Sequence, residues 1–381
     1  MKVVVAMDSL KGSLTSMEAG DAIKESILNV DSTCEVIVKP LADGGEGTTA
    51  ALVAGMGGVM ETLSVTGPIF EKVEAHFGLL PLSNTAIIEM AEAAGLPQVP
   101  ASFRNPLVTT TYGVGEMIKH CVEAGMRKFI VGIGGSATND AGIGMLMALG
   151  YRFLDESGNE VSQGGQGLAH IVSIDESKVL PALKECEFKI ACDVNNPLYG
   201  LNGAAHIYGP QKGATPEIVE ALDKGLMSFA DVVTKHKGED FSQRPGAGAA
   251  GGLGFAFTAF LNGTLESGIK IILEETKLEE ALKDADLVFT GEGRLDNQTA
   301  MGKAPIGVAK LAKKYNLPVI GIAGALAKEA KMCNVEGIDA YFSIVNAAMS
   351  LEDAMDKTKA RENMVQTVEQ IFQLIHVFQT K

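Results

Sequence analysis

The sequence predicts an α/β protein in which one α/β domain is inserted into another. Its first part alternates short β-branched runs with helical patterns, which is typical of a parallel sheet with right-handed crossovers. The same alternation returns near the C-terminus, whereas the middle contains antiparallel strand patterns. The length of 381 residues also favours two cores over one. We therefore expect a discontinuous domain of residues 1–60 and 272–381, an inserted mixed α/β domain of residues 61–271, and an active site in the cleft between them.

The N-terminal segment follows the order strand, loop, helix twice. Val3–Asp8 is a β-branched run that predicts the first strand, and Thr15 with Glu18 forms a capping-box pattern at the start of the helix after it. Cys34–Lys39 predicts the second strand, and Ala50–Ala54 predicts the second helix. Consecutive strands that are joined through helices are expected to pair in parallel.

The C-terminal segment repeats this order and ends in a helix. Its predicted strands are Asp286–Phe289, Pro318–Ala323 and Tyr341–Val345. The last helix is expected to begin after Ser350, where Asp353 would complete a second capping box. One face of this helix carries an apolar stripe that we expect to pack in the core: Met364, Val368, Ile371, Ile375 and Phe378.

The middle segment has a different pattern. Glu61–Pro81 contains alternating stretches on either side of Gly67 and Pro68, which predicts two antiparallel strands. Lys128–Gly132 and Lys189–Asp193 predict further strands.

Composition and charge make several classes of protein improbable. The net charge is −15 and there is neither a long basic run nor a tryptophan, which disfavours a nucleic-acid partner. No apolar run approaches the ~18 residues of a membrane helix, and the N-terminal apolar stretch ends too early for a signal peptide. The five cysteines are scattered and form no CxxC, so we expect a reducing, cytoplasmic location.

Carboxylates and glycines gather after the predicted strands of the discontinuous domain. In open α/β sheets, ligands bind beyond the carboxyl ends of the strands. The loops that combine carboxylates with glycine are Asp8–Ser13, Asp43–Gly47 and Gly291–Gln298. One such loop is usually a solvated turn, but three at one sheet edge indicate a binding site.

The inserted domain adds glycine-rich loops of its own. Gly134–Gly142 follows the strand at Phe129–Gly132, and its backbone N–H groups together with the start of the next helix predict an anion-binding cradle. Asp193 ends another strand. Gly203–Gly213, which contains Lys212, and Pro245–Gly254 are further glycine-dense turns.

Two glycine patterns bear on the alternative of a nicotinamide-dependent oxidoreductase. Gly132–Ala137 matches GxGxxA after a strand, but Phe153 and Leu154 stand where an acidic residue would bind the ribose, with Asp155 close by. Gly246–Gly251 matches GxGxxG without a strand before it. The first pattern keeps the oxidoreductase open. The absence of a Walker A motif excludes a P-loop kinase.

Taken together, these loops resemble the type 1 glycerate kinase family, the bacterial glycerate 2-kinases. The segments that carry the resemblance span almost the whole chain in family order: Asp8–Leu14, Pro40–Gly47, Gly132–Asp140, Cys192–Pro197, Gly203–Gly213, Pro245–Gly254, Thr290–Thr299 and Gly302–Val308. The departures are small, with Leu10 in place of an expected aromatic residue and Ala141 in place of a glycine.

The resemblance implies a Rossmann- or flavodoxin-like domain that carries an inserted second domain. It also implies that ATP and Mg²⁺ serve to phosphorylate D-glycerate to 2-phosphoglycerate. Attack through the 2-hydroxyl rests wholly on the resemblance. A kinase for another small hydroxy acid and a non-catalytic ligand-binding protein remain alternatives, although binding an organic acid does not need so many carboxylates.

Candidate roles follow from the chemistry of each residue type. Phosphoryl transfer needs positioning, charge neutralisation and an acceptor for the proton of the attacking hydroxyl. The predicted catalytic residues are Asp193, Asp296 and Lys11, the substrate-binding residues are Ser9, Asp43 and Arg294, and the ligands of Mg²⁺ are Asp43, Glu46 and Glu292. The residues predicted to bind nucleotide phosphates are Gly134, Gly135, Ser136, Ala137, Thr138, Asn139 and Lys212. Which carboxylate is base and which is ligand stays open, and the glycine loop could hold glycerate instead.

Overall fold

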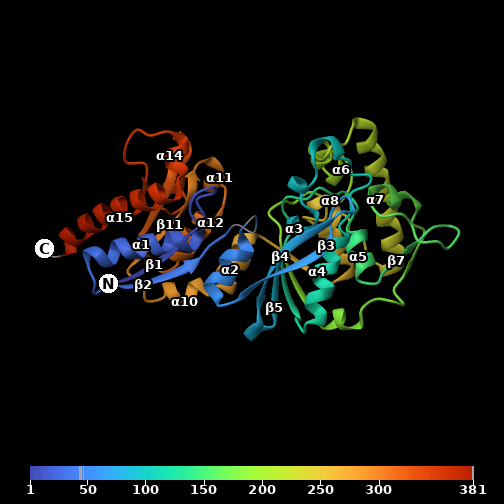
Figure 1. Cartoon of the computed structure of the whole chain (residues 1–381), viewed down its shortest axis with the longest axis horizontal. Coiled ribbons are helices and arrows are strands. Elements are labelled where there is room, and N and C mark those ends of the chain that lie inside the picture. Colours follow the sequence, from blue (N-terminus) through green and yellow to red (C-terminus); the bar gives the residue numbers. More distant parts are fainter. Residues whose placement is uncertain (43–44, 46, 380–381) are drawn as a thin grey trace. The chain divides into compact units, whose positions relative to one another are not determined.

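The computed structural model describes residues 1–42, 45 and 47–379 (Figure 1). The chain forms two compact units. The first comprises Met1–Asp43, Ala50–Gly57 and Ile269–Lys381, and the second comprises Gly44–Thr49 and Gly58–Gly268.

The first unit is built on a parallel sheet in the order β13-β12-β11-β1-β2. Its strands are β1 (Lys2–Met7), β2 (Glu35–Pro40), β11 (Leu287–Leu295), β12 (Val319–Leu326) and β13 (Ala340–Ser343). The predicted parallel pairing is therefore confirmed. Because all these strands run the same way, their carboxyl ends lie at one edge of the sheet.

Helices connect the strands of the first unit. They are α1 (Ser16–Val30), α2 (Thr48–Met56), α9 (Gly268–Glu275), α10 (Leu278–Leu282), α11 (Asn297–Ala300), α12 (Ala304–Lys313), α13 (Met332–Val335), α14 (Leu351–Met355) and α15 (Lys357–Gln379), with the 3-10 helix η7 (Lys328–Lys331). The capping box of Thr15 and Glu18 is present at the start of α1. Ile23 of α1 and Met364 of α15 are buried in one hydrophobic core with strand β1.

Two C-terminal predictions are wrong. The last helix does not begin after Ser350. That residue caps the short helix α14, and Asp356 then breaks the helical path and accepts a hydrogen bond from Lys359 N–H at the start of α15. Phe378 is 71% exposed rather than in the core. The part of α15 that packs in the core ends with Phe372 and the partly buried Ile375, and Phe378 lies beyond it.

Strand β11 is longer than predicted, since it runs through the glycines that we expected to form a loop. Glu292 and Arg294 pair with Ala323 and Ala325 of β12. A Cβ atom at Gly291 would lie 1.8 Å from the carbonyl oxygen of Ile322. The close approach of β12 therefore requires glycine at position 291. The next residue, Glu292, is consequently held on a strand rather than in a loop.

The second unit contains a mixed sheet in the order β10-β9-β6-β5-β4-β3. Its strands are β3 (Val59–Thr66), β4 (Lys72–Leu80), β5 (Thr85–Glu89), β6 (Lys128–Gly132), β9 (Glu187–Ala191) and β10 (Thr264–Glu266). Strands β3, β4 and β5 are antiparallel neighbours, which confirms the antiparallel pair predicted around Gly67, and the other pairs are parallel. A separate antiparallel pair consists of β7 (Arg152–Leu154) and β8 (Ser173–Asp175). The parallel sheet of the first unit and the mixed sheet of the second unit, each with its helices, confirm the α/β class.

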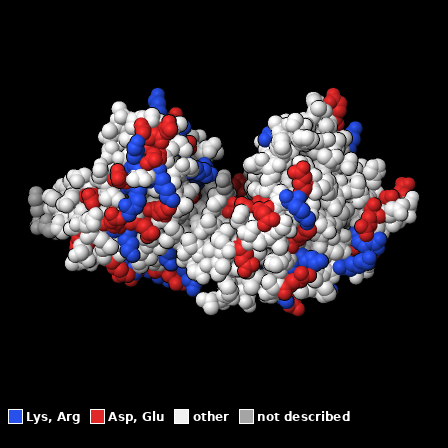
Figure 2. Space-filling model, in the orientation of Figure 1, with Lys and Arg blue, Asp and Glu red and all other residues white. Residues whose placement is uncertain are grey.

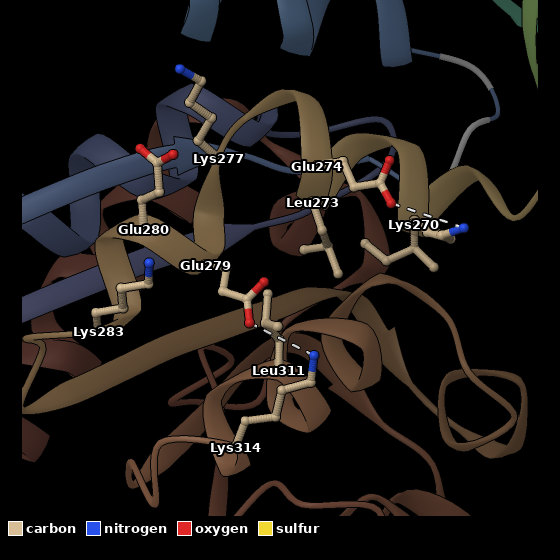
Figure 3. A pocket seen from close by; sticks show the side chains of 10 residues that line it. Lys270, Leu273, Glu274, Lys277, Glu279, Glu280, Lys283, Leu311 and Lys314 are labelled. Carbon is tan, nitrogen blue, oxygen red and sulfur yellow. Dashed lines mark ion pairs between the residues drawn. The ribbon is translucent and has the colours of Figure 1, made fainter.

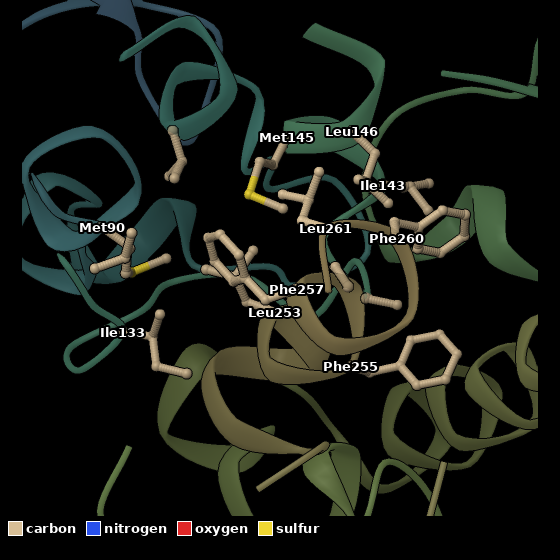
Figure 4. Packing of buried hydrophobic residues seen from close by; sticks show 14 of the residues in the cluster. Met90, Ile133, Ile143, Met145, Leu146, Leu253, Phe255, Phe257, Phe260 and Leu261 are labelled. Atoms are coloured by element: carbon tan, nitrogen blue, oxygen red, sulfur yellow. The ribbon is translucent and has the colours of Figure 1, made fainter. Parts of the chain in front are cut away.

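The core of the second unit is packed around helix α8 (Figure 4). The α-helices are α3 (Ala91–Ala94), α4 (Tyr112–Glu123), α5 (Ile143–Ala148), α6 (Ala204–Tyr208), α7 (Pro216–Lys237) and α8 (Ala249–Phe260). Short 3-10 helices are η1 (Pro81–Ser83), η2 (Leu96–Gln98), η3 (Ala101–Phe103), η4 (Gly165–His170), η5 (Pro181–Glu185) and η6 (Pro210–Lys212). Phe229 packs on Phe255 and Phe260, and aromatic pairs of this kind add about 0.5–1.5 kcal/mol each to the free energy of burial.

None of the helices in the described residues is long and apolar enough to cross a membrane.

Candidate active site

The carboxyl ends of β1 and β11 bring two predicted segments together in the first unit. Met7 pairs with Gly291, and the N–H of Asp8 donates a 2.8 Å hydrogen bond to the carbonyl oxygen of Gly291. The next pair along the strands is therefore Asp8 and Glu292, whose side chains are both buried. Parallel register thus places two carboxylates side by side at the sheet edge.

The loop after β1 folds over the glycines of β11. The N–H of Leu10 donates to the carbonyl oxygen of Leu14, which closes the loop. A Cβ at Gly293 would lie 3.4 Å from the backbone nitrogen of Lys11. Ser9 N–H donates to the carboxylate of Asp8 at 2.6 Å. The structure therefore gathers Ser9 and exposed Lys11 beside the β11 segment, as the sheet-edge argument predicts.

Asp296 lies one residue beyond β11 and caps helix α11. Its carboxylate accepts hydrogen bonds from the N–H groups of Gln298 at 2.8 Å and Thr299 at 3.3 Å. Thr299 Oγ1 in turn donates to Glu292, and Arg294 Nε lies 3.9 Å from Asp296 Oδ2. Glu292, Arg294 and Asp296 thus form one cluster. The 65% exposed side chain of Arg294 leaves its guanidinium accessible.

Two predicted metal ligands, Asp43 and Glu46, lie outside the described residues. Within the described part of the chain, no group of three His, Cys, Asp or Glu side chains is arranged to hold a metal ion. Mg²⁺ in phosphoryl-transfer sites usually takes only one or two carboxylates, with phosphate oxygens and water as the other ligands. Glu292 and Asp8 therefore fit a magnesium ion that arrives with phosphates.

In the second unit, the glycine loop has an open part and a buried part. Gly134 and Gly135 are exposed, and a Cβ at Gly134 would meet no atom within 4 Å. Ser136, Thr138 and Asn139 are buried. The open part offers bare backbone to a ligand, and the buried part fixes the conformation.

Asp140 anchors the end of this loop. Its fully buried carboxylate accepts hydrogen bonds from the N–H and Oγ1 of Thr111, both at 2.9 Å, and from the N–H groups of Gly142 and Gly144. Burial raises the pKa of Asp140, and these donors counteract that rise in part. The prediction that the start of α5 serves as part of an anion cradle is wrong, because Asp140 already occupies it.

Lys212 approaches the same loop from η6 and is only 2% exposed. Its ammonium donates to Ser136 Oγ at 2.7 Å and to the carbonyl oxygen of Thr138 at 2.6 Å. Burial lowers the pKa of Lys212 to about 7, and the charge of Asp140 opposes this shift. The ammonium is therefore bonded to the loop and faces inward.

Polar atoms of the loop lack partners. Among the residues that the structure describes, none is hydrogen-bonded to Thr138 Oγ1 or to either end of the Asn139 amide, although all these atoms are buried. A buried unsatisfied polar group costs roughly 1–3 kcal/mol. Such groups are typical of binding sites and give Asn139 the chemistry to bind a polar ligand.

The second glycine pattern, Gly246–Gly251, has a packing function. Gly251 has φ +68°, and a Cβ there would lie 2.1 Å from the carbonyl oxygen of Thr138. Its own carbonyl accepts from Ala141 N–H. The turn before the apolar part of α8 therefore supports the Thr138–Asp140 backbone. The first pattern, Gly132–Ala137, is separated from α5 by residues 138–142, whereas a dinucleotide motif opens directly into its helix.

Asp193 lies two residues beyond β9, which ends at Ala191 rather than at Asp193 as predicted. Its side chain is exposed, and Oδ1 accepts a 3.1 Å hydrogen bond from the N–H of Gly268. The structure therefore places Asp193 at the carboxyl end of a central strand, apart from the contacts of the glycine loop described above.

Two carboxylates of the second unit were not predicted as site residues from the sequence: Asp140, which is fully buried, and Glu89, which is half-buried. Asp140 lies inside the glycine-rich loop Gly134–Gly142 but was assigned no role from the sequence. Glu89 ends strand β5, where it pairs with Gly132, and its carboxylate accepts from Thr49 N–H at 2.8 Å. Burial raises the pKa of Glu89. The sequence contained a pattern that could have identified Glu89, because the strand-like run Thr85–Ile88 is followed directly by this glutamate.

Other surface features lie outside these clusters. On the face shown in Figure 2, acidic and basic side chains are interspersed. A pocket of about 560 Å³ between α9, α10 and α12 is lined by lysines and glutamates (Figure 3). Lys270 pairs with Glu274 and Lys314 with Glu279. None of its described lining residues is a predicted site residue.

Comparison with known proteins gives consistent matches. Residues 3–376 match the family model described as "Glycerate kinase family". The chain is 47% identical over 380 residues to a protein named Glycerate kinase from Bacillus subtilis (strain 168), covering 100% of this chain and 99% of that one. It is 48% identical over 354 residues to Glycerate 2-kinase from Escherichia coli (strain K12), covering 93% of both. A crystal structure from Salmonella typhimurium LT2 superposes with a TM-score of 0.93 at 45% identity, covering 100% of both chains.

Proposed function

Since the chain belongs to the glycerate kinase family, we propose that it transfers the γ-phosphoryl group of ATP to the 2-hydroxyl of D-glycerate, giving 2-phosphoglycerate and ADP. The family assignment confirms the resemblance predicted from the sequence. The choice of the 2-hydroxyl is supported by the name of the relative from Escherichia coli. A cytoplasmic location remains a prediction, drawn from composition and from the cysteines.

The observation that carries the proposal is the glycine loop of the second unit. Exposed backbone at Gly134 and Gly135, on a base fixed by Asp140 and Lys212, suits close approach of phosphate oxygens to N–H groups. We assign this loop to the nucleotide phosphates, with Asn139 as a further polar contact. Ser136, Ala137 and Thr138 complete the loop.

The cluster at the sheet edge of the first unit supplies the groups for glycerate. Arg294 can pair with the substrate carboxylate through two parallel hydrogen bonds, whereas Lys11 suits a phosphoryl group as a point charge. Ser9 is proposed to bind a substrate hydroxyl, and Asp43 is proposed as a further substrate contact. Mg²⁺ would neutralise phosphate charge. Its candidate ligands are the predicted residues Asp43, Glu46 and Glu292 together with Asp8, of which one or two carboxylates would hold the ion.

In the proposed reaction, a carboxylate accepts the proton of the 2-hydroxyl while that oxygen attacks the γ-phosphorus. The new bond joins O2 to phosphorus, the bond to the β,γ-bridging oxygen breaks, and ADP leaves with its electrons. Asp193 and Asp296 are the candidates for the proton acceptor. Each already accepts a backbone hydrogen bond that would orient its carboxylate, from Gly268 N–H in Asp193 and from Gln298 N–H in Asp296.

The first test is ADP release from Mg-ATP with a panel of hydroxy acids. We expect release that depends on D-glycerate and is far slower with L-lactate, glycolate or no acceptor. A different acid that outperforms D-glycerate would refute the assigned substrate. Reduction of NAD⁺ or NADP⁺ in place of ADP release would support an oxidoreductase.

Gly134→Ala tests whether the glycine loop binds the nucleotide. The added methyl meets no protein atom within 4 Å and Gly134 has no left-handed backbone, so folding should be unchanged. A phosphate that approaches this backbone closely would be obstructed. We expect KM for ATP to rise roughly 10-fold or more, by analogy with small displacements in other active sites.

The control for this substitution is KM for D-glycerate, which should change less than KM for ATP, together with an unchanged melting temperature. If KM for D-glycerate rises and KM for ATP does not, the loop binds glycerate. If neither changes, the loop binds neither substrate closely.

A further inference from the structure

Lys212 is a buried amine whose position is fixed by its own backbone. It is the last residue of η6, and its N–H donates to the carbonyl oxygen of Gly209. Gly213 follows with φ +92°, and a Cβ there would lie 2.3 Å from the carbonyl oxygen of Arg104. The chain at this point therefore has little freedom, and the lysine side chain extends from a rigid turn.

The ammonium of Lys212 joins two residues of the loop that flank Ala137. It donates to Ser136 Oγ and to the carbonyl oxygen of Thr138. Ala137 itself is held by other elements, since its N–H donates to Ala94 and its carbonyl accepts from Thr109 Oγ1. Successive residues of the loop are thus fixed from three separate segments.

Burying a lysine is costly, and an apolar side chain of similar length would fill the space with less desolvation. Asp140 is the charged group that acts on this amine, and Arg104, next to Gly213, directs its Nε to the carbonyl oxygen of Val99. Among the described residues, the side chain of Lys212 donates to two acceptors, and a neutral amine has two N–H groups to donate. The hydrogen bonds to the loop, more than the charge, therefore account for a lysine at this position.

We propose that Lys212 is a positioning residue. It holds Ser136–Thr138 so that the exposed backbone at Gly134 and Gly135 keeps the conformation that binds nucleotide phosphates, and it does not touch the phosphates itself. This inference rests on the proposed function, because it assumes that the loop binds ATP.

The test compares Lys212→Met with Lys224→Met, an exposed lysine on α7. Methionine keeps the length of the side chain and removes the donors. The dissociation constant for ATP, measured by calorimetry without glycerate, should rise roughly 10²-fold in Lys212→Met and stay unchanged in Lys224→Met. KM for D-glycerate should change by less than a factor of about 3, as expected for an effect confined to one substrate.

A double-mutant cycle with Ser136→Ala separates positioning from direct contact. If Lys212 acts through the loop, the two substitutions remove the same hydrogen bond, and their effects on the ATP dissociation constant should be clearly less than additive. Additive effects would show that Lys212 contacts the nucleotide independently, and would overturn the proposal. If Lys212→Met fails to fold, Ser136→Ala alone must still weaken ATP binding, and unchanged binding would overturn it.

The pH dependence of stability provides a second readout of the amine. An unfolded lysine titrates at 10.5, whereas the folded Lys212 titrates at about 7. Between these values the unfolded chain holds a proton that the folded chain has released, so stability should rise with pH across this window and be smallest below it. Lys212→Met should remove that slope, and an identical slope in the variant would show that the amine is not buried as described.

Failure of the proposed function can be distinguished from failure of the proposal for Lys212. If the protein binds ATP but does not phosphorylate D-glycerate, the assigned substrate is wrong, and the calorimetric comparison still tests Lys212. If wild-type protein binds no ATP, the inference is overturned as well.

Discussion

At least one of Asp193→Asn and Asp296→Asn should lose roughly 10²-fold or more in kcat while the protein stays folded. Asparagine keeps the side-chain oxygen that accepts the backbone hydrogen bonds, from Gly268 in one case and from Gln298 in the other. It is also as good a helix cap as aspartate. The substitution therefore removes the ability to accept a proton and keeps these backbone hydrogen bonds.

Asp356→Asn is the matched control. Asp356 also accepts a backbone hydrogen bond at the start of a helix, from Lys359, and it lies in neither cluster of predicted site residues. Its turnover should be normal. Single-turnover kinetics would locate the loss in the chemical step, and near-normal turnover in both test variants would remove Asp193 and Asp296 as the proposed base.

Asp140→Ala should lower the free energy of unfolding by roughly 3–5 kcal/mol, which is the cost of removing one partner from a buried charged network. The substitution leaves the donors of Thr111, Gly142 and Gly144 without an acceptor and takes away the charge opposite Lys212. Thermal unfolding and amide hydrogen exchange over residues 108–146 would measure the loss.

Asp155→Ala is the control for this change. Asp155 also accepts hydrogen bonds from backbone N–H groups, those of Ser157 and Asn159, but it does so in an exposed turn. Removing it should cost about 1 kcal/mol or less, because water can replace the lost acceptor. Equal losses in the two variants would contradict the account of a buried network.

Local signals were sufficient for much of the fold. The capping box at Thr15 and Glu18 marked the start of α1, and the β-branched run after Lys2 marked β1. The rule that ligands bind at the carboxyl ends of parallel strands was enough to predict that Asp8 and Glu292 lie at one edge of the sheet.

Local patterns failed where a distant partner decides the structure. Gly291 is a strand residue because Ile322 packs against it, and nothing in the surrounding sequence distinguishes that from a turn. Asp140 is hydrogen-bonded to Thr111, which is 29 residues away in the sequence, and Lys212 is hydrogen-bonded to Ser136, which is 76 residues away. These contacts depend on tertiary packing, so the sequence could identify the loop but not the residues that fix it.

The most direct test of the central claim is the proton-coupled phosphorus NMR spectrum of the product formed from Mg-ATP and D-glycerate. A phosphate on the 2-hydroxyl is attached to a carbon with one hydrogen and should give a doublet. A phosphate on the 3-hydroxyl is attached to a carbon with two hydrogens and should give a triplet. We expect the doublet of 2-phosphoglycerate, with ADP in equal amount, and either a triplet or ADP without a new phosphate ester would contradict the account.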